Sequence, residues 1–396
     1  MMAAAVLHKG TTILHNVPRI QDVFCMMGIL EYIGCVCSFE GHTLIIDAGA
    51  VSEVHIPEEY VRQMRSSIIL LGALLGRMGE AFTQYPGGCS IGKRPVDLHL
   101  YALSRLGAEI VEGHSEIAAR AAKLTGGIIC FSYPSVGATE NAILGAVLAD
   151  GVTEIHGAAR EPEITELCRF LENMGAEVDG AGTCHITVRG NCTLHDSVYC
   201  VPGDRIVAGT YLLACLACGG DIRLLGTPES HMKAVLDVCH RAGAVLEPGI
   251  REIWMKKSGK PCAMDIATAP YPGYPTDLQS PMLVVMSVAD GESQMAETVF
   301  EGRYATAEEL VKMGARIRIE GERAYVSGTE HLHGAEVEAK DLRGGAALVL
   351  AGMAAEGTTC ISQYQHIARG YEDICADLAA VGQNVCLGNQ NEGKKQ

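Results

Sequence analysis

Aromatic residues, basic residues and long apolar runs are all scarce in this chain. Aromatic side chains make up only 5% of its 396 residues, with a single tryptophan. Its cores must therefore be packed mainly from aliphatic and small side chains. Lysine and arginine number 31 against 47 acidic residues, a formal charge of −16. That balance argues against a general nucleic-acid or anionic-membrane surface. No apolar run is long and uninterrupted enough to cross a bilayer.

A disulfide framework is also missing, although cysteine itself is abundant. The sixteen cysteines show no framework spacing and follow no signal peptide, which is typical of free thiols in a reducing cytosol. We therefore expect a cytoplasmic protein. Cys215 and Cys218 form a Cys-x-x-Cys inside an apolar run expected to be helical over 206–218. Without a second pair, this favours small core residues over the alternative of a zinc or redox site.

A small tripeptide with a central glycine, usually Leu/Met-Gly-Ala, recurs six times at intervals of 68 to 73 residues. Glycine after the last turn of a helix, followed by a β-rich stretch, is a common helix exit. Each repeat is expected to run strand, helix, strand, helix, strand, strand, with right-handed crossovers and parallel strand pairs. The six glycines are Gly34, Gly107, Gly175, Gly243, Gly314 and Gly382.

Six such repeats predict an α/β protein of two domains, each with three βαβαββ repeats. We place the domains at residues 1–202 and 203–390, followed by a disordered tail at 391–396. Within the repeats we expect short strands at 12–14, 153–155, 222–224 and 359–361, and helices at 163–174 and 307–313.

One loop of the second repeat is longer than its counterparts in the other repeats. It reads Pro86-Gly-Gly-Cys-Ser-Ile-Gly-Lys-Arg-Pro95. Lys93 and Arg94 place Cys89 in electropositive surroundings that favour its thiolate, and Pro95 suits the first turn of a helix over 96–106. The spacing approaches a nucleotide P-loop, but Arg94 stands where that motif needs Ser or Thr. The alternative is a glycine-rich turn around a small buried cysteine.

Loops before helices hold most of the unusual residues. Equivalent loops around one axis converge on a common cleft, where arginines and helix N-termini bind phosphates or carboxylates. The alternative for any single arginine is a surface ion pair. Asp277 follows a proline-rich loop over 269–275, and is either an N-cap aspartate or a general base. The loop arginines are Arg65, Arg94, Arg160, Arg205, Arg303, Arg343 and Arg369.

At these positions the chain resembles the UDP-N-acetylglucosamine 1-carboxyvinyltransferase family of enolpyruvyl transferases, which is related to EPSP synthase. The resemblance covers residues 3–385. It is carried by long motifs at 16–22, 64–67, 86–99, 135–139, 159–164, 274–277, 297–301 and 366–371.

The resemblance implies an inside-out α/β barrel, with two three-repeat domains around a central cleft. It implies transfer of the enolpyruvyl group of phosphoenolpyruvate to the 3-hydroxyl of UDP-N-acetylglucosamine, with release of phosphate. This is the first committed step of peptidoglycan synthesis, in cell-wall biogenesis. The partners implied are these two small molecules, with no metal, organic cofactor, nucleic acid or membrane. The sequence does not determine the oligomeric state; we favour a monomer.

The resemblance also assigns roles to individual residues. Cys89 is implied as a general acid that bonds covalently to phosphoenolpyruvate and is alkylated by fosfomycin. Asp277 is implied as the acceptor of the 3-hydroxyl proton, and Arg369 as a third catalytic residue. The implied substrate-binding residues are Arg65, Arg94, Pro95, Val96, Asp97, Leu98, Tyr133, Pro134, Ser135, Val136, Gly137, Thr276, Asp277, Val299, Arg303, Arg343 and Arg369.

The first repeat is shorter than the others, with only nine residues before Gly10. The family carries a Gly-Ala-Lys-Asn string in the corresponding loop, and its lysine contacts phosphoenolpyruvate. We therefore expect that an N-terminal strand, loop and half-helix are missing from this sequence. The alternative function is a catalytically impaired or inactive paralogue, or truncated form, that binds the nucleotide sugar.

Overall fold

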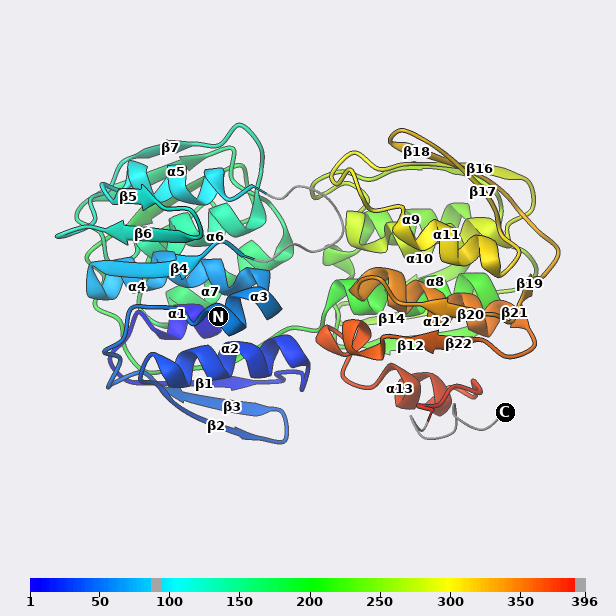
Figure 1. Cartoon of the computed structure of the whole chain (residues 1–396), viewed down its shortest axis with the longest axis horizontal. Coiled ribbons are helices and arrows are strands. Elements are labelled where there is room, and N and C mark those ends of the chain that lie inside the picture. The colour runs from blue at the N-terminus through cyan, green and yellow to red at the C-terminus, as the bar shows by residue number, and fades with distance from the viewer. Residues whose placement is uncertain (87–94, 389–396) are drawn as a thin grey trace. The chain divides into compact units, whose positions relative to one another are not determined.

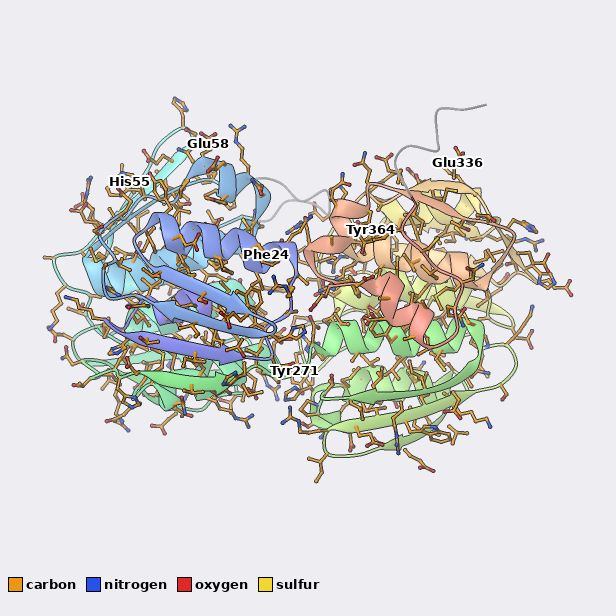
Figure 2. All side chains as sticks on the ribbon, turned by 90° about the horizontal axis from the view of Figure 1, so that it is seen from below. Phe24, His55, Glu58, Tyr271, Glu336 and Tyr364 are labelled. Atoms are coloured by element: carbon orange, nitrogen blue, oxygen red, sulfur yellow. The ribbon has the colours of Figure 1, made fainter. Side chains whose placement is uncertain are left out.

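The computed structural model describes residues 1–86 and 95–388. The predicted roles of Cys89 and Arg94, and the predicted tail at 391–396, lie outside the described residues. The chain divides into two compact units. Unit 1 comprises Met1–Gly203 and Ala269–Tyr274, and unit 2 comprises Asp204–Thr268 and the chain from Pro275 onward. The segment Ala269–Tyr274, which the predicted division assigns to the second domain, belongs to unit 1. Within it, the N–H of Tyr271, a residue labelled in Figure 2, donates to Glu161 Oε1 at 3.3 Å.

Unit 1 alternates helices and strands in the order predicted for the repeats. Its helices are α1 (Met2–Ala5), α2 (Gln21–Tyr32), α3 (Glu58–Gln63), η1 (Arg65–Ile69), α4 (Leu70–Met78), α5 (Asp97–Arg105), α6 (Val136–Ala146) and α7 (Pro162–Asn173). Its strands are β1 (Thr11–His15), β2 (Val36–Glu40), β3 (Thr43–Asp47), β4 (Glu80–Gln84), β5 (Glu109–Glu112), β6 (Glu116–Arg120), β7 (Ile128–Cys130), β8 (Val152–His156), β9 (Glu177–Asp179), β10 (His185–Arg189) and β11 (Ser197–Cys200).

The centre of unit 1 is formed by helices and its outside by sheets (Figure 1). Helices α4 and α6 pack against each other, and most of their side chains are buried because apolar and small residues occupy all their faces. Three sheets cover them, with strand orders β11-β1-β3-β2, β4-β6-β5 and β7-β8-β10-β9. Their strands alternate buried and exposed residues, as in β8 and β10, because one face packs on helices and the other faces water.

Unit 2 repeats this plan. Its helices are α8 (Arg205–Cys218), η2 (Glu229–His231), α9 (Lys233–Arg241), η3 (Thr276–Leu278), α10 (Gln279–Ser287), α11 (Ala305–Lys312), α12 (Leu342–Ala354), η4 (Tyr364–Arg369) and α13 (Ile374–Ala380). Its strands are β12 (Gly220–Leu225), β13 (Val245–Pro248), β14 (Glu252–Lys257), β15 (Asp265–Ala267), β16 (Glu292–Ala296), β17 (Arg316–Glu320), β18 (Arg323–Ser327), β19 (Leu332–His333), β20 (Glu336–Glu338), β21 (Ala355–Glu356) and β22 (Cys360–Ser362).

Helices α8, α10 and α12 pack together at the centre of unit 2, and every residue of α10 is buried. The sheets have strand orders β12-β14-β13, β15-β16-β18-β17, β19-β21 and β20-β22. The predicted inside-out α/β arrangement is therefore confirmed within each unit. Among the described residues, however, the sheets stay separate and none closes into a barrel. No helix in the described part of the chain is long and apolar enough to span a membrane.

The helix exits follow the repeat pattern closely. All six repeat glycines have a left-handed backbone, with φ between 87° and 106°, which only glycine adopts without strain. The expected parallel pairing is correct for only part of each sheet. For example, β7 runs parallel to β8, whereas β8–β10 and β10–β9 are antiparallel. The last two strands of each such repeat form a hairpin, and a hairpin forces antiparallel pairing.

Candidate active site

Asp277 lies on η3, the short helix before α10, in unit 2. Its Oδ1 accepts hydrogen bonds from Arg303 Nη2 at 3.0 Å and from Arg343 Nε at 3.4 Å. The sequence left open whether Asp277 is an N-cap. The N-cap of η3 is Pro275 and that of α10 is Leu278, neither with a capping side-chain bond. The carboxylate therefore pairs with two arginines instead of capping a helix.

Arg303 is 5% exposed and is held on both sides of its guanidinium. Its Nη1 donates to Thr276 Oγ1 at 2.8 Å, and its guanidinium lies 5.0 Å from the centre of the Phe300 ring. Thr276 Oγ1 in turn donates to Glu297 Oε2 at 2.9 Å. These contacts fix Arg303, so that its Nη2 reaches Asp277 with little freedom to move away.

Glu297 is a residue of this site whose role the sequence did not reveal. It is 2% exposed, and its Oε1 accepts the backbone N–H groups of Val299 and Phe300 at 2.8 and 3.0 Å. Glu297 thus connects the loop of the predicted substrate residue Val299 to Thr276. Its presence in the 297–301 motif was the available signal, but no spacing rule links a glutamate to a threonine 21 positions earlier.

Arg343 stands in the first turn of α12. Asp341 caps this helix, accepting the N–H groups of Arg343 and Gly344 at 2.9 and 2.8 Å. At Gly344 a Cβ atom would lie 2.2 Å from Thr306 Oγ1, so only glycine lets α12 begin here. The Arg343 guanidinium lies 5.9 Å from the centre of the Tyr371 ring, and the Tyr371 hydroxyl is 2.7 Å from Thr210 Oγ1.

Electrostatic interactions keep the Asp277 carboxylate and the Arg343 guanidinium ionised. Burial acts to raise the pKa of Asp277, but the positive charges of Arg303 and Arg343 outweigh it and hold that pKa well below its usual range. Burial acts to lower the pKa of Arg343, but the Asp277 carboxylate together with smaller contributions from Tyr371 and Asp204 more than reverses this and raises that pKa. Asp277 therefore accepts from two cations at once, while Glu297 supplies a second carboxylate to the cluster through Thr276.

Two donors of these arginines have no acceptor in the described part of the chain. Arg303 Nε and Arg343 Nη1 are buried and have no hydrogen-bond partner among residues 1–86 and 95–388. An unpaired buried donor is costly. These unpaired cationic donors suit the phosphate or carboxylate of a ligand.

In unit 1, four predicted residues line one cavity of about 600 Å³. Arg65 begins η1, and Pro95, Val96 and Asp97 lie at the start of α5. The expected helix over 96–106 forms over Asp97–Arg105, with Val96 as its N-cap, so Pro95 precedes the helix instead of lying in its first turn. Leu98 is partly buried in the first turn of α5.

The predicted residues 133–137 lead into α6, which begins at Val136. Ser135 caps this helix and accepts the Ala138 N–H at 3.4 Å. At Gly137 a Cβ atom would lie 2.8 Å from His99 Cε1, so the glycine lets α6 approach α5 closely. The beginnings of α5 and α6 therefore lie next to each other, and the first turn of a helix is suited to binding anions through its backbone N–H groups.

Asn141 is a second residue that the sequence did not reveal. It is fully buried in α6. Its Oδ1 accepts the Gly72 N–H at 2.8 Å, its Nδ2 donates to the Ile68 carbonyl at 2.9 Å, and Nδ2 is 2.8 Å from His99 Nδ1. One side chain thus joins η1 and α4, α5 and α6, the elements that carry the predicted residues of unit 1.

The structure brings some predicted residues together and leaves others apart. Thr276, Asp277, Arg303 and Arg343 contact one another directly. Arg369 ends η4, which packs on the start of α12, since a Cβ at Gly345 would lie 2.6 Å from Ile367 Cγ1. Among the other loop arginines, Arg205 contributes to the low pKa of Asp277, whereas Arg160 is exposed and bonds to the Gly182 carbonyl.

The Cys-x-x-Cys pair lies on α8, with Cys215 buried and Cys218 partly buried. Burial raises the pKa of both thiols to about 11. Both thiols are therefore protonated at neutral pH in the metal-free protein, which fits small core residues.

The comparisons with known proteins agree on one family. A family model described as EPSP synthase (3-phosphoshikimate 1-carboxyvinyltransferase) matches residues 1–378. The chain is 46% identical over 386 residues to UDP-N-acetylglucosamine 1-carboxyvinyltransferase 2 of Caldanaerobacter subterraneus subsp. tengcongensis, covering 97% of this chain and 93% of the relative. It is 41% identical over 385 residues to UDP-N-acetylglucosamine 1-carboxyvinyltransferase of Solidesulfovibrio magneticus, covering 97% and 92%.

Solved structures agree with this grouping. The enolpyruvyl transferase NikO from Streptomyces tendae matches with a TM-score of 0.87 and 25% identity, over 97% of this chain and 92% of that one. An EPSP synthase from Acinetobacter baumannii matches with a TM-score of 0.73 over 98% and 95%; at 18% identity this likeness concerns the fold alone.

Proposed function

Because this chain belongs to the UDP-N-acetylglucosamine 1-carboxyvinyltransferase family, we propose that it transfers the enolpyruvyl group of phosphoenolpyruvate to the 3-hydroxyl of UDP-N-acetylglucosamine, releasing phosphate. The enzyme then serves peptidoglycan synthesis in the cytoplasm. The observation that carries the proposal is the Asp277–Arg303–Arg343 cluster, which combines a carboxylate with unpaired cationic donors.

The arginines of this cluster bind phosphoenolpyruvate in the proposed mechanism. Arg303 Nε and Arg343 Nη1 are the donors that its phosphate or carboxylate would engage. Both guanidiniums are fixed by other contacts, so little reorganisation is needed when negative charge builds on the phosphate as it leaves the tetrahedral intermediate. Arg369, at the end of η4, is a further cation for the same ligand.

Asp277 is the proposed base for the 3-hydroxyl proton. With two arginines beside it, its pKa is too low for an effective base. An anionic ligand bound by the same arginines offsets part of their positive charge, which raises the pKa of Asp277. Binding of phosphoenolpyruvate therefore activates the base that the reaction requires.

Unit 1 supplies the proposed site for the nucleotide sugar. Arg65 and the start of α5 line the cavity, and the start of α6 lies beside α5. Backbone N–H groups at helix N-termini and an arginine are suited to a diphosphate. Residues 95–98 and 133–137 would contact the ligand largely through backbone and short side chains. The shape of this binding surface therefore depends little on long, flexible side chains.

The proton donor of the proposed reaction is Cys89, assigned by its motif. We further propose that Cys89 is the site of the phosphoenolpyruvate adduct and of alkylation by fosfomycin. The reaction needs neither a metal nor an organic cofactor, and a single chain contains all the residues assigned above.

The experiment that tests the function measures phosphate release by the purified chain from phosphoenolpyruvate and UDP-N-acetylglucosamine. We expect release that depends on both substrates and a mass gain on the sugar product equal to one enolpyruvyl group. Calorimetric titration with the nucleotide sugar is run in parallel. Binding without any phosphate release would contradict the transferase and favour a protein that only binds the nucleotide sugar.

A further inference from the structure

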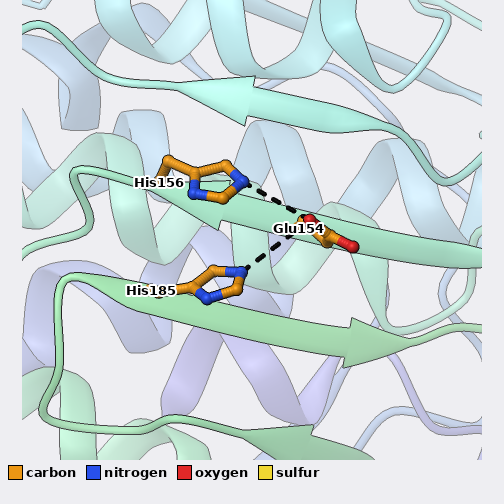
Figure 3. Close-up of side chains that lie close together, drawn as sticks. All are labelled: Glu154, His156 and His185. Carbon is orange, nitrogen blue, oxygen red and sulfur yellow. Dashed lines mark ion pairs between the residues drawn. The ribbon is translucent and has the colours of Figure 1, made fainter.

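Two histidines and a glutamate meet on the outer face of the sheet β7-β8-β10-β9 in unit 1 (Figure 3). Glu154 and His156 are two positions apart on β8, so their side chains share a face. His185 on β10 is the cross-strand partner of His156 in the antiparallel register. Thr153 and Ile155, which alternate with Glu154 and His156 along β8, are buried and point into the core.

The three side chains are close enough to share one ion. His156 Nε2 lies 3.4 Å from Glu154 Oε2, and His185 Nε2 lies 3.8 Å from the same oxygen. The ligand atoms of all three lie within 4.8 Å of one another, and this is the one such group of three in residues 1–86 and 95–388. A tetrahedral zinc ion with bonds of about 2.0–2.2 Å holds its ligand atoms roughly 3.4 Å apart.

We propose that Glu154, His156 and His185 form a binding site for one divalent transition-metal ion of the zinc class. Two imidazoles with one carboxylate are donors that suit Zn²⁺, whereas Mg²⁺ and Ca²⁺ prefer oxygen ligands alone. The side chains are between 44% and 50% exposed, so an ion reaches them from solution. Three protein ligands leave the fourth position for water or a donor from another molecule.

The competing explanation is a pair of surface ion pairs between Glu154 and protonated histidines. The two imidazole rings stack, with centres 4.4 Å apart and planes 12° apart. Two imidazolium ions at that distance repel each other, and exposed ion pairs contribute little stability. A bound cation instead uses both rings in their neutral form, with both Nε2 atoms beside the same carboxylate oxygen. None of these residues belongs to the candidate active site, so the proposal is independent of the transferase function.

The test is a calorimetric titration of the full chain with Zn²⁺ in excess Mg²⁺, comparing wild type with H156Q, H185Q and E154Q. The matched control is H55Q. His55 and Glu53 have the same two-residue spacing, with Nδ1 2.8 Å from Oε1, and His55 is likewise on the surface of unit 1 (Figure 2). No third ligand joins that pair in the described residues.

We expect one Zn²⁺ per chain at this site, with affinity at least ~10-fold weaker in each of the three variants and unchanged in H55Q, because each variant removes a ligand. Cys130, which is in register with His156 on β7, is checked by C130S and by the visible spectrum of bound Co²⁺. Equal Zn²⁺ affinity in H156Q, H185Q and wild type would overturn the proposal. So would a thiolate-to-cobalt charge-transfer band, which assigns the ion to cysteines. Circular dichroism confirms that each variant is folded.

Discussion

Unit 2 presents its candidate site residues as a network of charged side chains, whereas unit 1 presents them mainly as backbone at the beginnings of two helices. In unit 2, the Asp277 carboxylate is held by two buried or half-buried arginines. In unit 1, the neutral side chain of Asn141 makes hydrogen bonds that join the helices next to Arg65, Pro95 and Ser135. The same repeat thus carries the proposed reaction centre as a charged cluster in one unit and the proposed nucleotide-sugar site as a shaped surface in the other.

The difference has a physical reason. A reaction that moves protons and phosphate needs fixed charges at the reacting atoms, where they stabilise the transition state. Recognition of the sugar and the base, which are the uncharged parts of the nucleotide sugar, needs shape, which helix ends and short side chains provide at low entropic cost. Changes in unit 2 should therefore lower kcat, whereas changes in unit 1 should raise KM for the nucleotide sugar.

The largest effect is expected for D277N. The amide cannot accept the 3-hydroxyl proton, so we expect kcat for phosphate release to fall by about 10²–10⁴-fold, with little change in KM for the nucleotide sugar. The matched control is D237N, which alters an exposed aspartate on α9 that pairs with Arg241. Steady-state kinetics with both substrates measures this. A kcat within a factor of about two of wild type would remove Asp277 from the chemistry.

A smaller loss is expected for R343K. Lysine keeps the charge but loses the planar set of donors, including Nη1. We expect kcat/KM for phosphoenolpyruvate to fall by about 10²-fold, as for the loss of one fixed donor at an anion. R318K is the control, because Arg318 is exposed on β17 and pairs with Glu320. If R343K affects only KM for the nucleotide sugar, the division of roles between the units is wrong.

How much of this could be predicted from the sequence differs between the two units. The repeat glycines predicted where helices end, and all six have the expected left-handed backbone. This prediction succeeds because the end of a helix is governed by a local steric rule. Asp277, Arg303 and Arg343 were named by motif, but their mutual pairing joins residues up to 66 positions apart. Asn141 was missed, because a single buried amide within an apolar helix has no sequence pattern that tells which backbone groups it satisfies.

An intermediate effect on stability is expected for N141A. The change leaves the Gly72 N–H and the Ile68 carbonyl without their side-chain partner in a buried setting. We expect the free energy of unfolding to fall by about 1–3 kcal/mol, and KM for the nucleotide sugar to rise while KM for phosphoenolpyruvate stays unchanged. Urea unfolding and steady-state kinetics measure the two effects.

The control for N141A is N173A, which removes a hydrogen bond to Ser197 at the end of α7. It should lower the free energy of unfolding without changing either KM. If N141A does the same, Asn141 has a structural role only and does not position the elements of unit 1.

The smallest expected effect is a pH dependence of the free energy of unfolding, which the Asp277 site of unit 2 should show and the Asn141 site of unit 1 should not. The pKa of Asp277 is lower in the folded protein than in the unfolded chain, where an aspartate titrates near about 3.9. Its ionised form therefore contributes stability that is fully present above that value and is lost as the pH falls through the folded pKa. We expect the difference in unfolding free energy between wild type and D277N to be constant from about pH 7 to 5 and to shrink below about pH 4. The difference between wild type and N141A should not change over that range, because Asn141 does not titrate. Urea unfolding at each pH measures both differences, and an Asp277 contribution that grows on acidification would contradict the pairing with Arg303 and Arg343.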